Sequence, residues 1–268
     1  MTSERISGLG DPRVAAYRNM SDAERLRDQG LFVAESRAVV QRLLQDRRYR
    51  VRSLLVNDAA AAALAPAVTS RGDDLPMFVC ETDDFRRLTG HALHRGCLAL
   101  VERPVPIPFD DLLASARTVI VLEGITDPDN VGSIFRNAAA LGSDAVVLSP
   151  TCCDPLYRKA IRTSMGAVLT VPFARAANWS DTLASLRTRR FTIVALTPRA
   201  PSETIAAFAA RPRPERLALI VGTEGSGLSA AVESAADDRV RIPISEAVDS
   251  LNVGVAVGIA LYAIRSRH

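Results

Sequence analysis

The sequence has few cysteines, few aromatic residues and almost no lysine, and these shortages limit what it can be. Among its 268 residues are four cysteines, one tryptophan and a single lysine, Lys159. Four scattered cysteines are too few for a disulfide framework. No apolar run approaches the ~18 residues of a membrane-spanning helix, and no apolar stretch of a signal peptide is present near the N-terminus. We therefore expect a cytoplasmic protein without a membrane segment.

One group of metal-ligating residue types is present, with the spacing HxxHxxC. It consists of His91, His94 and Cys97. A structural zinc site needs four ligands, and no fourth candidate lies nearby in the sequence. We therefore predict that the protein binds no metal.

The net charge of +3 excludes a polycation, although 33 of the residues are basic. The arginines gather in three groups, around 42–52, 158–162 and 187–190. Arginine suits phosphate recognition because its planar fork donates two parallel hydrogen bonds. Runs of exposed charge are more often solvated faces, so the arginine groups alone only suggest a nucleic-acid partner.

A proline-rich link divides the chain. Pro104, Pro106 and Pro108 stiffen residues 104–108, which we take as a linker between a domain of residues 1–103 and one of residues 109–268. In the first domain, apolar spacing predicts helices and strands in alternation, typical of a small α/β domain. We expect helices over 33–45, 59–65 and 83–88, and strands over 51–57, 77–80 and 97–101.

The second domain shows a clearer repeat of strand and helix. Continuous apolar runs of this kind are typical of strands buried on both faces of a parallel sheet. Strands are predicted at 118–124, 145–149, 167–171, 191–197, 217–222 and 239–244, with helices after Gly132, around 155–165 and over 252–265. The pattern predicts an α/β fold with a mostly parallel sheet and helices on both faces.

Three loops of this domain follow strands and carry polar residues, which is where ligands bind in parallel sheets. The first loop, 123–132, leads into a helix, and we place Arg136 near the first turn of that helix. A cation beside a helix N-terminus is unfavourable for stability unless an anion binds there. The alternative is an exposed arginine paired with Asp127 or Asp129.

The second loop, 222–229, has three glycines, which let backbone amides approach a ligand closely. Residues 225–230 match the dinucleotide fingerprint GxGxxA, which leaves a nicotinamide-dependent oxidoreductase as an alternative. A Rossmann unit would start its domain, however, whereas only one strand and one helix follow here. The sequence lacks GxxxxGK[ST], which excludes a P-loop.

The third loop, 242–253, ends with Ser250 and Asn252 where the last helix is predicted to begin. One of the two residues would suit the N-cap of that helix. A cap explains one polar side chain and leaves the remainder of the segment unexplained.

Together the three loops resemble a known family. The segments DPDNVGSIFRNAAALG (127–142), IVGTEGSGLS (220–229) and IPISEAVDSLNVGVAVGIALY (242–262) are similar to the three motifs of the SpoU/TrmH branch of the SPOUT methyltransferases. RTSMGA (162–167) matches the pattern between the first two motifs. The resemblance implies a homodimeric enzyme that transfers a methyl group from S-adenosylmethionine to a ribose 2′-hydroxyl of rRNA or tRNA. It also implies a deep trefoil knot formed by the C-terminal segment.

The same resemblance implies roles for individual residues. Arg136 would hold the target phosphate and stabilise the developing alkoxide, because guanidinium keeps its proton and is a poor base. The residues implied to orient substrate are Asn130, Glu224, Ser250 and Asn252. The residues implied to bind S-adenosylmethionine are Leu196, Thr197, Gly222, Gly227, Ile242, Ile244 and Leu251. Arg162 matches an arginine that grips RNA in some relatives.

The N-terminal region resembles, more weakly, the ribosomal-protein-like RNA-binding domain of this branch. The similarity rests on FVAES (32–36), where Ser36 replaces the usual glycine, and on HRG (94–96). If it holds, Arg47, Arg48 and Arg50 are candidates for phosphate contacts. An RNA-binding protein that has lost catalytic activity remains an alternative. The presence of the complete set of motif residues argues against it.

Overall fold

The computed structural model describes residues 3–8, 10–18, 23–89, 96–223 and 225–265. These residues form two compact units. The first unit comprises 1–105 together with 156–165, and the second comprises 106–155 together with 166–268. The short helix α8 (Arg158–Thr163) thus belongs to the first unit, although its neighbours in sequence belong to the second.

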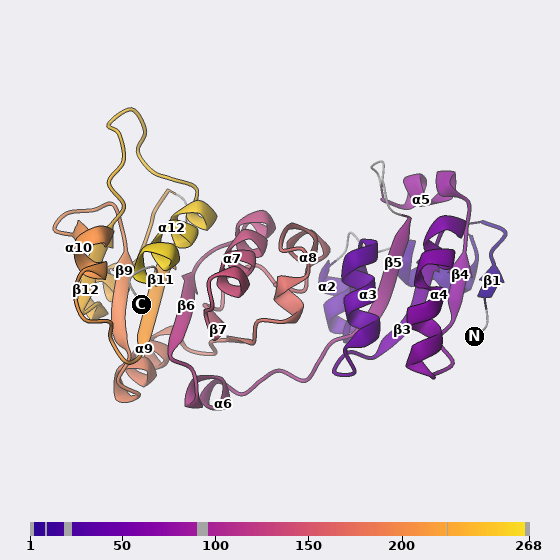
Figure 1. Ribbon diagram of the computed structural model, residues 1–268, viewed down its shortest axis with the longest axis horizontal. Coiled ribbons are helices and arrows are strands. Elements are labelled where there is room, and N and C mark those ends of the chain that lie inside the picture. The colour runs from indigo at the N-terminus through magenta and orange to yellow at the C-terminus, as the bar shows by residue number, and fades with distance from the viewer. Residues whose placement is uncertain (1–2, 9, 19–22, 90–95, 224, 266–268) are drawn as a thin grey trace. The chain divides into compact units, whose positions relative to one another are not determined.

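The first unit is built on a five-stranded mixed sheet. Its order is β1-β4-β3-β5-β2, in which β1, β4 and β3 are parallel and β5 pairs antiparallel with both β3 and β2. Helices α3 and α4 lie side by side in Figure 1. The strands are β1 (Ser3–Arg5), β2 (Leu31–Glu35), β3 (Val51–Val56), β4 (Met77–Val79) and β5 (Cys97–Glu102). The helices are η1 (Pro12–Val14), α1 (Ala15–Arg18), α2 (Ala23–Asp28), α3 (Arg37–Gln45), α4 (Asp58–Arg71) and α5 (Thr82–Thr89).

The predicted helix over 33–45 is wrong in its first turn. Residues up to Glu35 belong to strand β2, and the helix begins at Arg37 with Ser36 as its N-cap. Pairing with β5 buries Phe32 and Val33 on opposite faces of the sheet, a gain that exceeds their helical preference.

The second unit contains a seven-stranded sheet in which every strand pair is parallel. The order is β10-β12-β9-β11-β6-β7-β8. The strands are β6 (Thr118–Glu123), β7 (Ala145–Leu148), β8 (Phe173–Arg175), β9 (Thr192–Leu196), β10 (Glu203–Thr204), β11 (Leu217–Gly222) and β12 (Asp238–Arg241). The helices are α6 (Phe109–Ala114), α7 (Pro128–Ala140), η2 (Ala167–Leu169), α9 (Trp179–Thr188), α10 (Ile205–Ala209), α11 (Ala230–Ala235) and α12 (Val253–Arg265). The predicted parallel α/β fold is confirmed.

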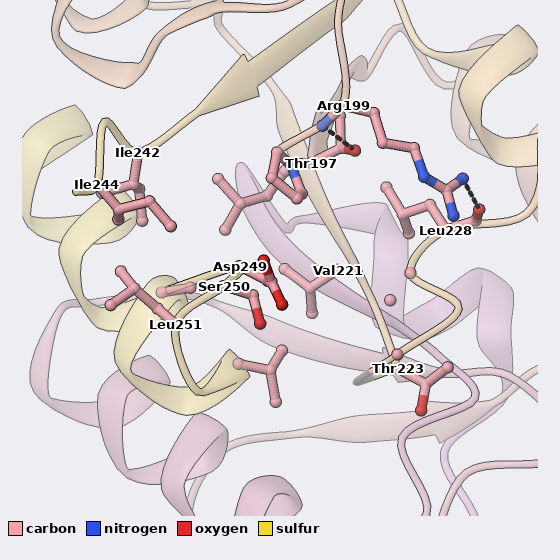
Figure 2. A pocket seen from close by; sticks show the side chains of 17 residues that line it. Thr197, Arg199, Val221, Thr223, Leu228, Ile242, Ile244, Asp249, Ser250 and Leu251 are labelled. Atoms are coloured by element: carbon pink, nitrogen blue, oxygen red, sulfur yellow. Dashed lines mark hydrogen bonds between the residues drawn. The ribbon is translucent and has the colours of Figure 1, made fainter. Parts of the chain in front are cut away.

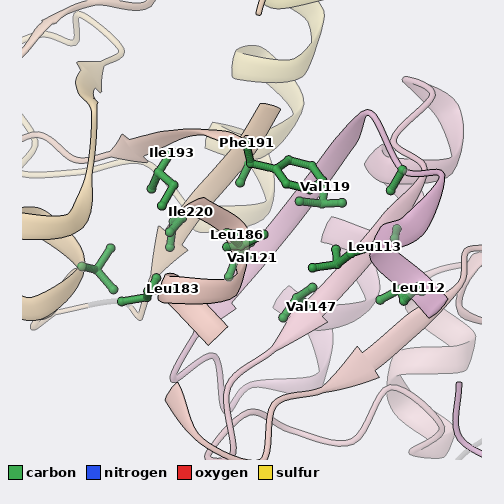
Figure 3. Packing of buried hydrophobic residues seen from close by; sticks show 14 of the residues in the cluster. Leu112, Leu113, Val119, Val121, Val147, Leu183, Leu186, Phe191, Ile193 and Ile220 are labelled. Atoms are coloured by element: carbon green, nitrogen blue, oxygen red, sulfur yellow. The ribbon is translucent and has the colours of Figure 1, made fainter. Parts of the chain in front are cut away.

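A hydrophobic cluster fills one face of this sheet. Alternate side chains of the central strands, such as Val119, Val121 and Ile220, pack there against side chains from α6, α9 and α11 (Figure 3). The intervening residues, such as Ile120 and Val146, are also fully buried and point to the opposite face. Burial on both faces explains why these strands are continuous apolar runs.

Three expected boundaries in this unit differ from the structure, the first being the strand expected over 239–244, which ends at Arg241. Residues 167–169 form a 3₁₀ turn that starts after Gly166, a glycine with a φ of 80°, and the strand follows at 173–175. Helix α7 begins at Pro128 rather than after Gly132. Asp127 caps it by accepting a hydrogen bond from the Asp129 amide (2.9 Å), and the fixed φ of proline suits the first helical position.

Helices α7 and α12 pack closely against each other, which requires glycine at the contact. A Cβ atom on Gly254 would lie 2.4 Å from Oγ of Ser133, and one on Gly258 would lie 3.1 Å from Nδ2 of Asn137. The Asn137 amide also donates to the Gly254 carbonyl (2.7 Å). The close approach fixes the start of α12 relative to α7, and both helices carry predicted site residues.

No helix within the described ranges combines the length and the apolarity needed to cross a membrane.

Candidate active site

The candidate site lies at the carboxyl edge of the parallel sheet. Strands β9, β11 and β12 all end at this edge, and the loops that follow them line a cavity of about 420 Å³ together with the start of α12 (Figure 2). This volume is within the usual range of small-molecule sites, roughly 300–1,000 Å³. The seven residues that the resemblance assigns to S-adenosylmethionine all line it: Leu196, Thr197, Gly222, Gly227, Ile242, Ile244 and Leu251.

The wall of the cavity is mainly apolar side chains and glycine backbone. The loop after β11 folds tightly, with an isolated bridge between Thr223 and Gly227. A Cβ atom on Gly222 would lie 2.4 Å from the Gly227 carbonyl carbon, so only glycine fits there. Such a surface can enclose an uncharged heterocycle while its backbone groups supply hydrogen bonds.

Asn130 and Asn252 are hydrogen-bonded to each other, although 122 residues separate them. Nδ2 of Asn252 donates to Oδ1 of Asn130 at 2.7 Å, and Asn130 is buried on α7. Oδ1 of Asn252 accepts from the Gly254 amide (3.0 Å), so the residue also caps α12. A single side chain, that of Asn252, therefore both caps α12 and contacts α7. Ser250, two residues earlier, lines the cavity.

Arg136 lies in the third turn of α7 and is exposed. The expected position on the first turn is wrong because the helix begins earlier, so the argument from the helix dipole does not apply to this arginine. Among the described residues it has no hydrogen-bond or ion-pair partner, and Asp127 instead accepts from the Asp129 amide. Its guanidinium is therefore available to an anion. Glu224, the remaining predicted catalytic residue, lies outside the described residues.

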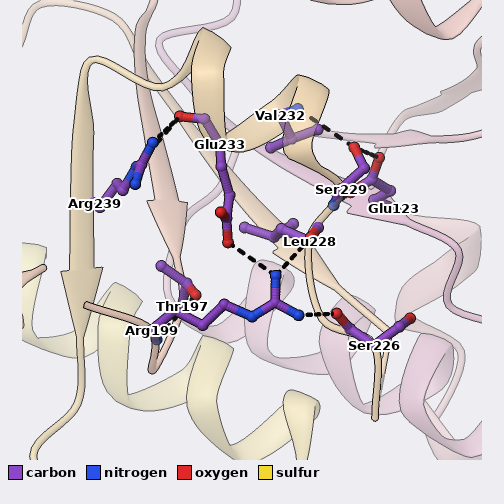
Figure 4. A network of polar contacts seen from close by, with 9 residues as sticks. All are labelled: Glu123, Thr197, Arg199, Ser226, Leu228, Ser229, Val232, Glu233 and Arg239. Atoms are coloured by element: carbon purple, nitrogen blue, oxygen red, sulfur yellow. Dashed lines mark hydrogen bonds and ion pairs between the residues drawn. The ribbon is translucent and has the colours of Figure 1, made fainter. Parts of the chain in front are cut away.

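The loop after β11 is held in place by a carboxylate that was not predicted from the sequence. Glu123, at the end of β6, accepts hydrogen bonds from Nε1 of Trp179 (2.7 Å) and from the amide and hydroxyl of Ser229 (2.8 and 2.7 Å). Ser229 in turn caps α11 (Figure 4). An acidic residue at the end of a buried strand is the signal that could have identified it.

Arg199 was also missed, and it joins two of the loops that line the cavity. Its guanidinium donates to the carbonyls of Ser226 and Leu228 and pairs with Glu233 on α11 (Figure 4). Because Arg199 follows β9 and its acceptors follow β11, it holds the ends of two neighbouring strands together. No motif points to this residue.

The residues predicted to bind RNA lie in the first unit, and each has an acceptor within that unit. Arg48 pairs with Asp46 (2.6 Å), Arg50 with Glu102 (3.5 Å), and Arg47 donates to the Arg71 carbonyl. Arg162 and Arg158 on α8 both contact Glu35, at 3.8 and 3.0 Å. Glu35 is buried, so its charge is compensated by these two arginines.

Two alternatives considered from the sequence can be located. Of the proposed zinc cluster, His91 and His94 lie outside the described residues, and Cys97 is buried on β5, where burial raises the pKa of its thiol to about 12. The GxGxxA segment leads into α11, which has only six residues. In a dinucleotide site, the fingerprint belongs to the βαβ unit that opens the domain, whereas here the strand that follows it, β12, is the last described strand of the sheet along the chain.

The sequence profile of the SpoU rRNA Methylase family matches residues 117–262. An uncharacterized tRNA/rRNA methyltransferase of Mycobacterium tuberculosis is 43% identical over 96% of this chain and 90% of its own length. A 23S rRNA (guanosine-2′-O-)-methyltransferase of Vibrio vulnificus is 34% identical over 66% of this chain and 72% of its own length.

Among solved structures, the AdoMet-bound rRNA methyltransferase of Sinorhizobium meliloti shares the fold, with a TM-score of 0.82 and 24% identity. The alignment covers 99% of this chain and 98% of that one. The profile covers more than half of the chain, and the first relative matches along almost all of it. The chain therefore belongs to the SpoU rRNA methylase family.

Proposed function

We propose that this protein is an RNA 2′-O-methyltransferase that uses S-adenosylmethionine and acts on rRNA or tRNA. The observation that carries the proposal is the Asn130–Asn252 hydrogen bond, which joins the first and third motifs beside a cavity lined by the second and third. Family membership supports the same reaction, since one relative is named as a 2′-O-methyltransferase of 23S rRNA.

The residues of the cavity fit the methyl donor. Leu196, Ile242 and Leu251 offer apolar contacts to an adenine ring, and the glycines of the loop after β11 leave its backbone open to the ligand. When bound, S-adenosylmethionine supplies a methyl group already activated by its sulfonium. What remains for the protein is alignment of the ribose hydroxyl, which can lower a barrier by roughly 7–11 kcal/mol.

We assign the alignment to the polar residues near the cavity. Arg136 would bind the phosphate beside the target ribose and stabilise negative charge on the 2′-oxygen as its proton leaves. Asn130, Ser250 and Asn252 would orient the nucleotide, with Glu224 holding the substrate or its own loop. Because arginine does not release its proton, the proton would pass to the phosphate, to water or to a neighbouring side chain.

Three further properties belong to the proposal. The C-terminal segment forms a trefoil knot, as the family resemblance implies, and the loops after β9, β11 and β12 that line the cavity would belong to it. The first unit, which resembles a ribosomal-protein fold over residues 1–103, binds RNA. Arg47, Arg48, Arg50 and Arg162 are the candidates for its phosphate contacts, and Arg48 contributes least because its guanidinium is already paired with Asp46. The protein works in the cytoplasm, where such RNA is found.

We further propose a homodimer that associates through α12. Val255, Ile259 and Tyr262 form an apolar stripe along this helix at helical spacing and are exposed by 50, 38 and 64%. A second copy of the chain would cover this stripe, which lies on the helix that begins at Asn252. Sedimentation of wild type and Ile259→Glu tests this, since the charged variant should sediment as a monomer.

Calorimetric titration tests the proposed function first. S-adenosylmethionine and S-adenosylhomocysteine should bind, whereas NADH should give no heat of binding. Transfer of a labelled methyl group to total RNA, followed by nuclease digestion, should then yield a 2′-O-methylated nucleoside. Tight NADH binding without the methionine-derived ligands would overturn the proposal, and binding without any transfer to RNA would favour a module that has lost catalysis.

A further inference from the structure

The cavity carries two charges among its described lining residues, one of each sign. They are Arg199 after β9 and Asp249 in the loop before α12. The remaining described lining residues are apolar, small or uncharged. The charge that the cavity presents to a ligand therefore depends on how far each of these two groups is already neutralised within the chain.

The positive charge of Arg199 is compensated. Nη1 lies 3.3 Å from a carboxylate oxygen of Glu233 and 3.3 Å from the Leu228 carbonyl, while Nη2 donates to the Ser226 carbonyl. These acceptors draw the guanidinium toward the loop after β11 and toward α11 (Figure 4). Arg199 thus offers little attraction to an anionic ligand.

The negative charge of Asp249 is not compensated. Within the described part of the chain, its carboxylate has neither a hydrogen-bond nor an ion-pair partner, and it is directed into the cavity beside Ser250 (Figure 2). Asp249 is exposed in the free protein, so water screens this charge until a ligand fills the cavity and excludes solvent from the carboxylate. The cavity therefore favours a ligand with positive charge.

The position of Asp249 indicates which cation it meets. It precedes Ser250 directly and lies three residues before Asn252, whose amide contacts Asn130. This end of the cavity is where the methyl group must leave if the proposed function, on which this inference rests, is correct. The sulfonium carries that methyl group and must lie at the same end.

We propose that Asp249 is a specificity-determining residue whose carboxylate binds the sulfonium of S-adenosylmethionine and so distinguishes it from the neutral product. During transfer, a bond forms between the ribose 2′-oxygen and the methyl carbon while the sulfur–carbon bond breaks. The electron pair of that bond stays on sulfur, which becomes an uncharged thioether, and the hydroxyl proton passes to the phosphate, to water or to a neighbouring side chain. Asp249 then loses its partner, which weakens the binding of S-adenosylhomocysteine and favours its release.

The Asp249→Asn variant tests the proposal because it removes the charge and keeps the shape. We expect S-adenosylmethionine to bind 5- to 10-fold more weakly by calorimetry, whereas S-adenosylhomocysteine changes less than twofold. An analogue with a protonated amine in place of the sulfonium should weaken like S-adenosylmethionine. In steady-state assays KM for the methyl donor should rise while kcat does not fall, since the lost contact is stronger with the substrate than with the transition state.

A matched control is Glu246→Gln, which removes an exposed carboxylate from the same loop without touching the cavity. It should leave the affinities for both ligands within twofold of wild type. Equal weakening of S-adenosylmethionine and S-adenosylhomocysteine in Asp249→Asn would overturn the inference, as would no change in either. Failure of the wild type to bind either ligand would instead count against the proposed function.

Discussion

The arginines of the two units differ in whether their charge is already paired within the chain or is available to a ligand. In the first unit, Arg48 and Arg50 lie in a dense arginine cluster, yet each contacts a carboxylate of its own unit. In the second unit, Arg136 stands apart from other arginines and has no such partner among the described residues. The comparison shows that the number of arginines in a segment does not measure the charge available to phosphate, because internal acceptors neutralise part of it.

The strongest test of this comparison is Arg136→Ala. If Arg136 has the role proposed for it, removing this unpaired cation should lower methyl transfer by roughly 10²–10³-fold, the usual loss for one electrostatic contact to a developing oxyanion. The affinity for S-adenosylmethionine should stay within twofold, because Arg136 does not line the cavity. Transfer of labelled methyl to RNA and calorimetry measure the two effects, with Arg136→Lys as the charge-retaining control. Normal turnover of the alanine variant would refute the assigned role.

Substitution of Asn252 should have the next largest effect on methyl transfer, because its amide both caps α12 and contacts α7. Asn252→Asp should keep the helix cap and lose the donor to Asn130, so transfer should fall more than tenfold while the melting temperature changes little. Asn252→Ala removes both contacts and should also cost about 1 kcal/mol of stability. Initial rates and thermal unfolding of the two variants separate the contributions. If Asn252→Asp were as active as wild type, the role of Asn252 would be structural and not catalytic.

The carboxylates of the two units also differ in which groups donate hydrogen bonds to them. Asp46 in the first unit accepts from Arg48, whereas Glu123 in the second accepts from Trp179 and Ser229 and so supports the loop after β11. Glu123→Ala leaves a partly buried indole N–H without its acceptor and should destabilise the protein by ~1–3 kcal/mol. Weaker binding of S-adenosylmethionine, by several-fold, should accompany this loss. Glu123→Gln, which retains one acceptor oxygen, should show a smaller decrease in both measurements.

The smallest expected effect is that of Arg48→Ala. Its ion pair with Asp46 is exposed, and such pairs contribute ~0–1 kcal/mol to stability. Since the guanidinium is already paired, we expect less than a twofold change in affinity for RNA, measured by filter binding at fixed salt. A loss of tenfold or more would mean that the pair opens when RNA binds, and the two units would then differ less than their free structures suggest.

The sequence predicts the parallel sheet well because buried strands such as 118–123 and 217–222 are apolar on both faces. It fails where a local signal competes with tertiary pairing. Residues 33–35 have a helical spacing but pair with β5, and the strand expected at 167–171 is displaced beyond the turn at Gly166.

The candidate site could be predicted only in part. The loops at the carboxyl edge follow from strand order, and seven of the lining residues follow from the family resemblance. The Asn130–Asn252 contact depends on how α12 docks on α7, which no local pattern encodes. Arg199 belongs to no recognisable signature, and Asp249 lies within the third motif without a role that the resemblance assigns to it. The importance of both residues comes from which neighbours neutralise them.

The two strands at the edges of the parallel sheet are short, which affects how readily the protein aggregates. β10 has two residues and β8 has three, and the Arg175 side chain of β8 folds back onto the carbonyls of Ser149 and Cys152. Short, charged borders offer little unpaired backbone on which a foreign strand could grow. Concentrated solutions of this protein should therefore resist cross-β aggregation.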